Sequence, residues 1–188
     1  MLINFLKQSW LVILSSLIFG LLVSGIYGQL KPKIDEQARL KLEREMMKAF
    51  MKEAAVFESA LNAEKTQYFI GKNAEGAVVG YAIEAEGGGF ADKIRLLVAI
   101  DKPLEKLMGI GILKSSETPG FGDKIKETEF KDQFSDSPAG KLKVLKEGDR
   151  SVKDEAIIAI TGATISSDSV VKIVNNAVLE LKKVLGNK

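Results

Sequence analysis

The sequence predicts an α+β protein: a single N-terminal transmembrane helix followed by a domain with a mixed or antiparallel sheet flanked by helices. Three observations support this fold class. Residues 8–30 contain no charged side chain. Short apolar runs of β-prone residues follow between residues 77 and 113, separated by glycine, proline and charged residues. Near the C-terminus, an apolar run and a hydroxyl-rich turn lead into an amphipathic helical pattern.

The uncharged N-terminal segment is long enough to span a bilayer, since about 20 apolar helical residues cross the hydrocarbon core. Trp10 and Tyr27 stand near its ends, where interfacial aromatic rings are enriched. A cleaved signal peptide is the competing interpretation, but no good small-x-small cleavage site follows. Basic residues lie on both sides of the segment, so charge alone does not settle its orientation. We therefore expect a short tail at residues 1–7 and a transmembrane helix at residues 8–30.

A helical connector is expected at residues 31–62, because residues 34–62 are rich in helix formers and contain no glycine or proline. Apolar residues recur there every three or four positions, as on one face of a helix. They are Ala38, Leu42, Met46, Phe50, Ala54, Phe57 and Leu61. Methionines within this stretch indicate either ordinary packing or a methionine-lined groove for a partner.

A globular domain is expected at residues 63–188. Its predicted strands lie at residues 77–87, 94–100, 107–113 and 156–160, with a further edge strand at 139–144 and partly helical structure at 122–134. Residues 87–90, Gly-Gly-Gly-Phe, resemble a phosphate-binding loop, but no helical pattern follows directly, so a flexible connection is favoured. The final helix follows the turn at residues 161–167.

The composition narrows the possible chemistry. With 27 basic and 25 acidic residues the formal charge is +2, so no nucleic-acid partner is expected. The chain has no cysteine and no histidine, which excludes disulfides, thiolate nucleophiles, iron–sulfur clusters, histidine-ligated haem and the usual zinc sites. Any redox chemistry therefore requires an organic cofactor.

Two segments are candidates for ligand binding. The turn at residues 161–167, Thr-Gly-Ala-Thr-Ile-Ser-Ser, joins a strand to a helix and so fits either an anion site at the helix N-terminus or a plain helix cap. The loop at residues 115–124, Ser-Ser-Glu-Thr-Pro-Gly-Phe-Gly-Asp-Lys, has glycines that let the backbone approach a planar ring. A surface loop with turn residues is the simpler interpretation of that second segment.

Together and in this order, the stretches SSETPGFGDKI and TGATISS resemble the G subunit of the Rnf electron-transport complex, a membrane-anchored FMN-binding protein. The chain is more distantly similar to the C subunit of the sodium-translocating NADH:quinone oxidoreductase. The resemblance implies FMN joined by its phosphate to the hydroxyl of Thr164, and a separate flavin transferase that takes the FMN from FAD with a divalent metal. It further implies cofactor-binding roles for Thr161, Gly162, Ala163, Ser166 and Ser167 around the phosphate, and for Glu117, Thr118, Gly120 and Lys124 near the flavin.

The function implied by this resemblance is electron transfer rather than independent catalysis. The expected partners are the other membrane and redox subunits of an ion-translocating ferredoxin:NAD oxidoreductase, and the domain is expected on the extracytoplasmic side of the cell membrane. NADH oxidation by this chain is not implied, because it has no dinucleotide fingerprint. Two alternatives stay open: the quinone-reductase C subunit, and a non-redox membrane-tethered assembly module in which residues 161–167 only cap a helix.

Overall fold

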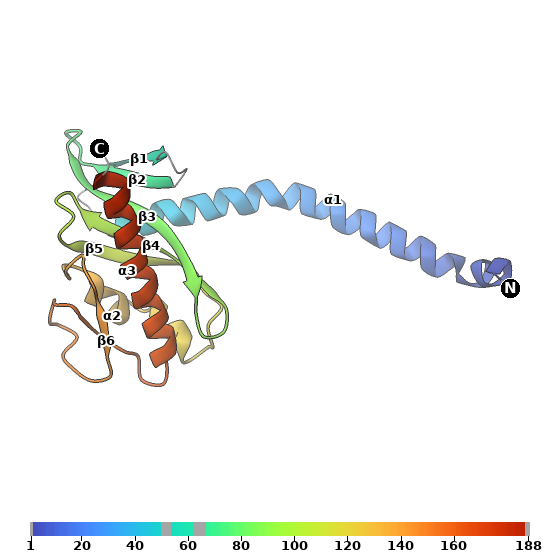
Figure 1. The fold of residues 1–188 in the computed structure, drawn as a ribbon. Coiled ribbons are helices and arrows are strands. Elements are labelled where there is room, and N and C mark those ends of the chain that lie inside the picture. Colours follow the sequence, from blue (N-terminus) through green and yellow to red (C-terminus); the bar gives the residue numbers. More distant parts are fainter. Residues whose placement is uncertain (1, 50–53, 62–66, 187–188) are drawn as a thin grey trace. The chain divides into compact units, whose positions relative to one another are not determined.

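The computed structural model describes residues 2–49, 54–61 and 67–186 (Figure 1). The chain forms two compact units, residues 1–41 and residues 42–188. The first unit consists of the N-terminal part of helix α1, which as a whole spans Leu2–Ala49 and contains Pro32. Residues 2–7 of the expected tail are helical, and Pro32 marks a change of composition without ending the helix.

Helix α1 is long and apolar enough, from Ser9 onward, to cross a membrane. Its most apolar window has a mean hydropathy of 2.2, and none of that window is buried by other parts of the protein. It is the one such helix among the described residues. Because a helix with this many exposed apolar side chains is not covered by a protein core, the lipid interior is the environment that suits it.

The second unit is built on a five-stranded antiparallel sheet in the order β1-β2-β3-β4-β5. The strands span Val56–Leu61, Gln67–Lys72, Val78–Gly88, Lys93–Asp101 and Leu107–Lys114. Strands β3, β4 and β5 confirm the three strands expected between residues 77 and 113. The register pairs Gly87 with Ile94 and Gly88 with Lys93, so the tip of the β3–β4 hairpin lies at residues 89–92.

Both faces of this sheet are covered. Helix α3, Thr164–Gly186, packs on one face through the apolar stripe that the sequence predicts, which includes Val170, Val174 and Leu181 (Figure 1). The opposite face carries a smaller cluster in which Met46 and Ala49, from the end of α1, pack against the sheet. Met46 is therefore a packing residue.

The segment between the sheet and α3 is made of short elements. A 3-10 helix η1 (Gly122–Lys126), helix α2 (Thr128–Lys131) and a second 3-10 helix η2 (Asp132–Phe134) confirm the partly helical structure expected there. Strands β6 (Lys143–Leu145) and β7 (Ala156–Ile158) pair in parallel as a separate two-stranded sheet. The observed β6 begins four residues later than the predicted edge strand, and β7 ends two residues earlier than predicted.

The prediction of a continuous helix over residues 34–62 is wrong for its last part, because Val56–Leu61 forms strand β1. Phe57 and Ala60 explain the error. A spacing of three residues puts two side chains on one face of a helix but on opposite faces of a strand. Phe57 packs in the smaller cluster, and Ala60 packs on the face of the sheet that α3 covers. The same spacing of apolar residues is therefore also found in a strand that packs on both of its faces. Residues 50–53 and 62, also part of that prediction, lie outside the described residues.

Candidate functional site

The turn between β7 and α3 is held in shape by Ser167. This side chain is fully buried, and its hydroxyl accepts a hydrogen bond from the Ile160 amide at 3.1 Å and donates one to the Ala163 carbonyl at 3.0 Å. Both hydrogen-bonding directions of the hydroxyl are thus used within the turn. Ser167 does not line the pocket described below, and its hydroxyl contacts lie within the turn. The phosphate contact expected for it stays a prediction.

Gly162 and Phe121 bring this turn against the loop that follows β5. Gly162 has φ +79°, and a Cβ there would lie 3.1 Å from Cδ1 of Phe121. In the loop, the amides of Phe121 and Asp123 both donate to the Thr118 carbonyl at 3.2 Å. The two segments singled out from the sequence therefore meet in space, although 36 residues lie between them.

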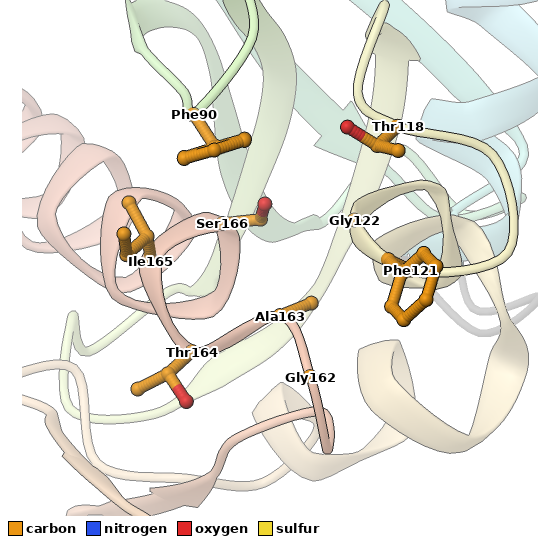
Figure 2. A pocket seen from close by; sticks show the side chains of 9 residues that line it. All are labelled: Phe90, Thr118, Phe121, Gly122, Gly162, Ala163, Thr164, Ile165 and Ser166. Atoms are coloured by element: carbon orange, nitrogen blue, oxygen red, sulfur yellow. The ribbon is translucent and has the colours of Figure 1, made fainter.

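A pocket of about 450 Å³ opens where these segments meet the tip of the β3–β4 hairpin (Figure 2). The hairpin contributes Phe90, and the loop after β5 contributes Thr118, Phe121 and Gly122. The turn and the start of α3 contribute the rest of the lining: Gly162, Ala163, Thr164, Ile165 and Ser166. Figure 2 shows Phe90 and Phe121 on different sides of the pocket, with Ser166 and Gly122 between them.

The pocket is lined by large apolar side chains and by residues that carry hydroxyl groups. Phe90, Phe121 and Ile165 are 63%, 56% and 58% exposed, which is unusual for large apolar side chains placed so close together. Thr118, Thr164 and Ser166 supply hydroxyls. Pockets of this size with apolar walls and a few polar groups are typical binding sites for cofactors.

Thr164 is exposed and is the first residue of the 23-residue helix α3. Amides in the first turn of a helix have no acceptor within the helix, and the helix dipole adds partial positive charge at that end. An anionic group attached at Thr164 would therefore lie in a favourable electrostatic environment. The hydroxyl contacts of Ser167 go to the Ile160 amide and the Ala163 carbonyl, so they do not occupy the first-turn amides of α3.

Glu117 is buried behind the pocket wall, with 4% exposure. Its Oε1 accepts hydrogen bonds from the amides of Phe90 at 3.0 Å and Ala91 at 3.1 Å, and its Oε2 accepts one from the Ser166 hydroxyl. Glu117 is therefore not part of the pocket lining, and the flavin contact expected for it stays a prediction. The Gly-rich segment at residues 87–90 is correspondingly part of a fixed hairpin rather than a flexible connection.

Lys124 and Thr161 lie in a second, smaller pocket of about 140 Å³, which also includes Arg150 and Glu129. The Arg150 guanidinium pairs with Glu129 and donates to the Ala159 carbonyl at 3.4 Å. Gly120 has φ +78° and shapes the loop, but it lines neither pocket. Of the expected site residues, the structure thus brings Thr118, Gly162, Ala163, Thr164 and Ser166 together around one pocket.

Phe90 was missed as a site residue by the sequence reasoning, as were Phe121, Gly122 and Ile165. The available signal was an aromatic residue directly after three glycines in a turn between strands, since an exposed ring at a hairpin tip needs a reason. Within the part of the chain that the structure describes, no group of three His, Cys, Asp or Glu side chains could hold a metal ion.

Comparisons with known proteins agree with this geometry. The model of the FMN-binding domain family matches residues 89–179, which begin at the hairpin tip and include all three segments that line the pocket. The chain is similar to the G subunit of an ion-translocating oxidoreductase complex from Methanosarcina acetivorans, with 36% identity over 76% of this chain and 79% of that protein. It is 30% identical to the G subunit of a proton-translocating ferredoxin:NAD(+) oxidoreductase complex from Clostridium ljungdahlii, over 91% of this chain and 88% of that protein.

Solved structures show the same fold. The crystal structure of the C subunit of the Na(+)-translocating NADH-quinone reductase from Parabacteroides distasonis matches with a TM-score of 0.55 and 22% identity, over 66% of this chain and 65% of that one. NqrC from Shewanella oneidensis matches with a TM-score of 0.51 and 19% identity, over 70% and 72%. These two likenesses show the fold alone, whereas the relationship to the Rnf-type G subunits rests on identity along the sequence. The chain contains an FMN-binding domain and is membrane-associated, and it belongs to the family of G subunits of ion-translocating oxidoreductase (Rnf) complexes.

Proposed function

We propose that this chain is a membrane-anchored electron carrier that holds FMN covalently on Thr164. It acts within an ion-translocating ferredoxin:NAD oxidoreductase complex, next to the other membrane and redox subunits. The observation that carries this proposal is the position of Thr164: an exposed hydroxyl on the first residue of α3 that also lines the 450 Å³ pocket. A phosphoester at this hydroxyl attaches the phosphate at a helix N-terminus, which favours anions.

The residues of the pocket fit FMN. Exposed Phe90 and Phe121 offer aromatic surfaces to a planar ring system, and Gly122 leaves that wall without a side chain. The volume of about 450 Å³ is within the range of roughly 300 to 1,000 Å³ found for small-molecule sites. When bound, FMN supplies one- and two-electron redox chemistry. The protein contributes the attachment at Thr164, hydroxyls from Thr118 and Ser166, and exclusion of water by the aromatic rim.

The proposed attachment needs no cysteine or histidine, in agreement with a chain that has neither. A flavin transferase presents FAD to Thr164. A bond forms between Oγ of Thr164 and the phosphorus on the FMN side of FAD, the P–O–P linkage breaks, and AMP leaves. The hydroxyl proton passes to a base of the transferase. Because Thr164 is exposed, the enzyme can reach this hydroxyl in the folded protein.

Two neighbouring threonines give a matched test. The full chain is co-expressed with an active flavin transferase, separated by denaturing electrophoresis and examined for flavin fluorescence in the band. We expect a fluorescent band for wild type and for Thr161→Val, because Thr161 lies in the smaller pocket. Thr164→Val should lose the fluorescence. A Thr164→Val band as bright as wild type would contradict the proposal, as would a dark wild-type band when the transferase modifies another substrate.

The globular unit is further proposed to lie on the extracytoplasmic side of the cell membrane. The absence of native cysteine makes the test simple, since one introduced thiol is then the only one. Glu105→Cys places it on the exposed turn between β4 and β5. A membrane-impermeant maleimide should label this variant in intact spheroplasts. Labelling that requires lysis would place the domain in the cytoplasm.

A further inference from the structure

The buried carboxylate of Glu117 joins three segments that are far apart in the sequence. Its hydrogen bonds reach the hairpin tip at Phe90 and Ala91 and the first turn of α3 at Ser166, while Glu117 itself belongs to the loop after β5. These segments are the three walls of the larger pocket. The partners of each hydrogen bond are at least 26 residues apart in the sequence, so these contacts are not those of a local turn.

Two glycines leave the space that this carboxylate fills. A Cβ at Gly89 would lie 2.3 Å from Oε1 of Glu117, and a Cβ at Gly122 would lie 2.8 Å from Oε2. Neither distance is compatible with a side chain, because real Cβ atoms do not approach other atoms so closely. The positions of the glycines and of Glu117 therefore depend on one another.

The three donors to Glu117 are neutral: two backbone amides and one hydroxyl. None of the ion pairs observed between described residues includes Glu117. Hydrogen bonds of this kind stabilise a carboxylate without cancelling its charge. Since the group is 4% exposed, solvent screens that charge only weakly.

We propose that Glu117 is a positioning residue that holds the Phe90 hairpin and Ser166 in place around the pocket, and that its negative charge lowers the midpoint potential of the FMN bound there. The inference rests on the proposed function for the identity of the ligand. Ser166 and Gly122 touch both the carboxylate and the pocket, so a ligand filling the pocket lies directly in front of Glu117. Reduction adds electrons to the ligand, and a fixed negative charge behind the wall opposes added negative charge.

The charge is tested with Glu117→Gln, which keeps the size of the side chain and an oxygen that accepts hydrogen bonds. Glu105→Gln is the matched control, because it removes the same charge from an exposed turn at the opposite end of β4. The full flavin-loaded chain is titrated with redox dyes as electron donors, and the midpoint potential is read from the flavin absorbance. We expect Glu117→Gln to raise the equilibrium constant for reduction of the flavin at least tenfold. For a two-electron couple this raises the midpoint potential by about 30 mV. Equal potentials for Glu117→Gln and wild type would overturn the charge effect, and so would an equal shift in Glu105→Gln.

The positioning role is tested without flavin, on the full chain expressed in the absence of a transferase. Hydrogen–deuterium exchange is followed at the amides of Phe90 and Ala91. We expect Glu117→Ala to speed their exchange at least tenfold and Glu117→Gln to retain most of their protection, because the amide oxygen still accepts. Unchanged exchange in Glu117→Ala would overturn the positioning role. Wild type that takes up no FMN from an active transferase would overturn the proposed function and the charge effect, while the exchange result still decides the positioning role.

Discussion

Replacing Gly162 by alanine should have two separate effects. One is a loss of stability through the backbone conformation, and the other is a change in the pocket through the contact with Phe121. Gly162 has φ +79°, a conformation that costs an L-residue roughly 1–2 kcal/mol. The new Cβ would also lie 3.1 Å from Cδ1 of Phe121. Because the Phe121 ring is 56% exposed, it can shift by a few tenths of an ångström at little cost in stability. The shift nevertheless moves one wall of the pocket.

Gly76 is the matched control for this substitution. Its φ is +81°, almost the same as that of Gly162, and a Cβ there would meet nothing within 4 Å. We therefore expect Gly162→Ala and Gly76→Ala to lower the free energy of unfolding by similar amounts, about 1–2 kcal/mol each. Only Gly162→Ala should slow the incorporation of FMN, by several-fold, because only it displaces Phe121.

Stability is measured by urea unfolding of the full chain in detergent, followed by far-ultraviolet circular dichroism. Incorporation is measured as a time course of covalent flavin fluorescence with a fixed amount of transferase. Equal rates for the two alanine variants would show that the contact between Gly162 and Phe121 does not shape the site. Wild-type stability for both variants would refute the argument from backbone conformation.

The remaining predictions concern the core and the hairpin. Ser167→Ala should lower the free energy of unfolding by about 1–3 kcal/mol, because it leaves the buried Ile160 amide without its acceptor. Urea unfolding measures this loss, and a loss near zero would contradict the structural role of Ser167. Phe134→Ala, which removes a fully buried ring from the larger cluster, should cost about 3–5 kcal/mol in the same assay. The hydrogen bond from Lys93 lowers the pKa of Glu86 below its ordinary 4.5, so the stability from this pair is present above pH 4.5 and is lost as the pH falls through the lowered pKa. An NMR titration should give a midpoint for Glu86 below 4.5, and Lys93→Ala should raise it.

Much of the second unit could be predicted from local sequence patterns. The strands β3, β4 and β5 alternate with turn residues, and the apolar stripe of α3 has a clear helical period, so pattern and structure agree. The two segments of the binding site were recognised because they occur together. Local patterns failed at residues 56–61, where the spacing of Phe57 and Ala60 suits a helix as well as a strand buried on both faces.

Contacts between distant residues could not be predicted in this way. Nothing near Glu117 in the sequence indicates that its carboxylate binds the amides of the hairpin tip 26 and 27 residues earlier and a hydroxyl 49 residues later. The same holds for Phe90, whose place in the pocket follows from the register of the β3–β4 hairpin. Lys124 is close to the residues of the larger pocket in sequence, but it lines the smaller pocket. Its expected place near the flavin stays a prediction.

The central claim is that FMN is bound covalently to Thr164, and tandem mass spectrometry of the wild-type chain tests it most directly. The chain is co-expressed with an active flavin transferase and digested with trypsin. Cleavage after Lys153 and Lys172 releases the peptide of residues 154–172, which contains every hydroxyl of the α3 turn. We predict that this peptide carries the mass of one FMN less one water, and that fragment ions place the addition on Thr164. An unmodified peptide, or fragment ions that place the flavin on Thr161, Ser166 or another residue, would contradict the account.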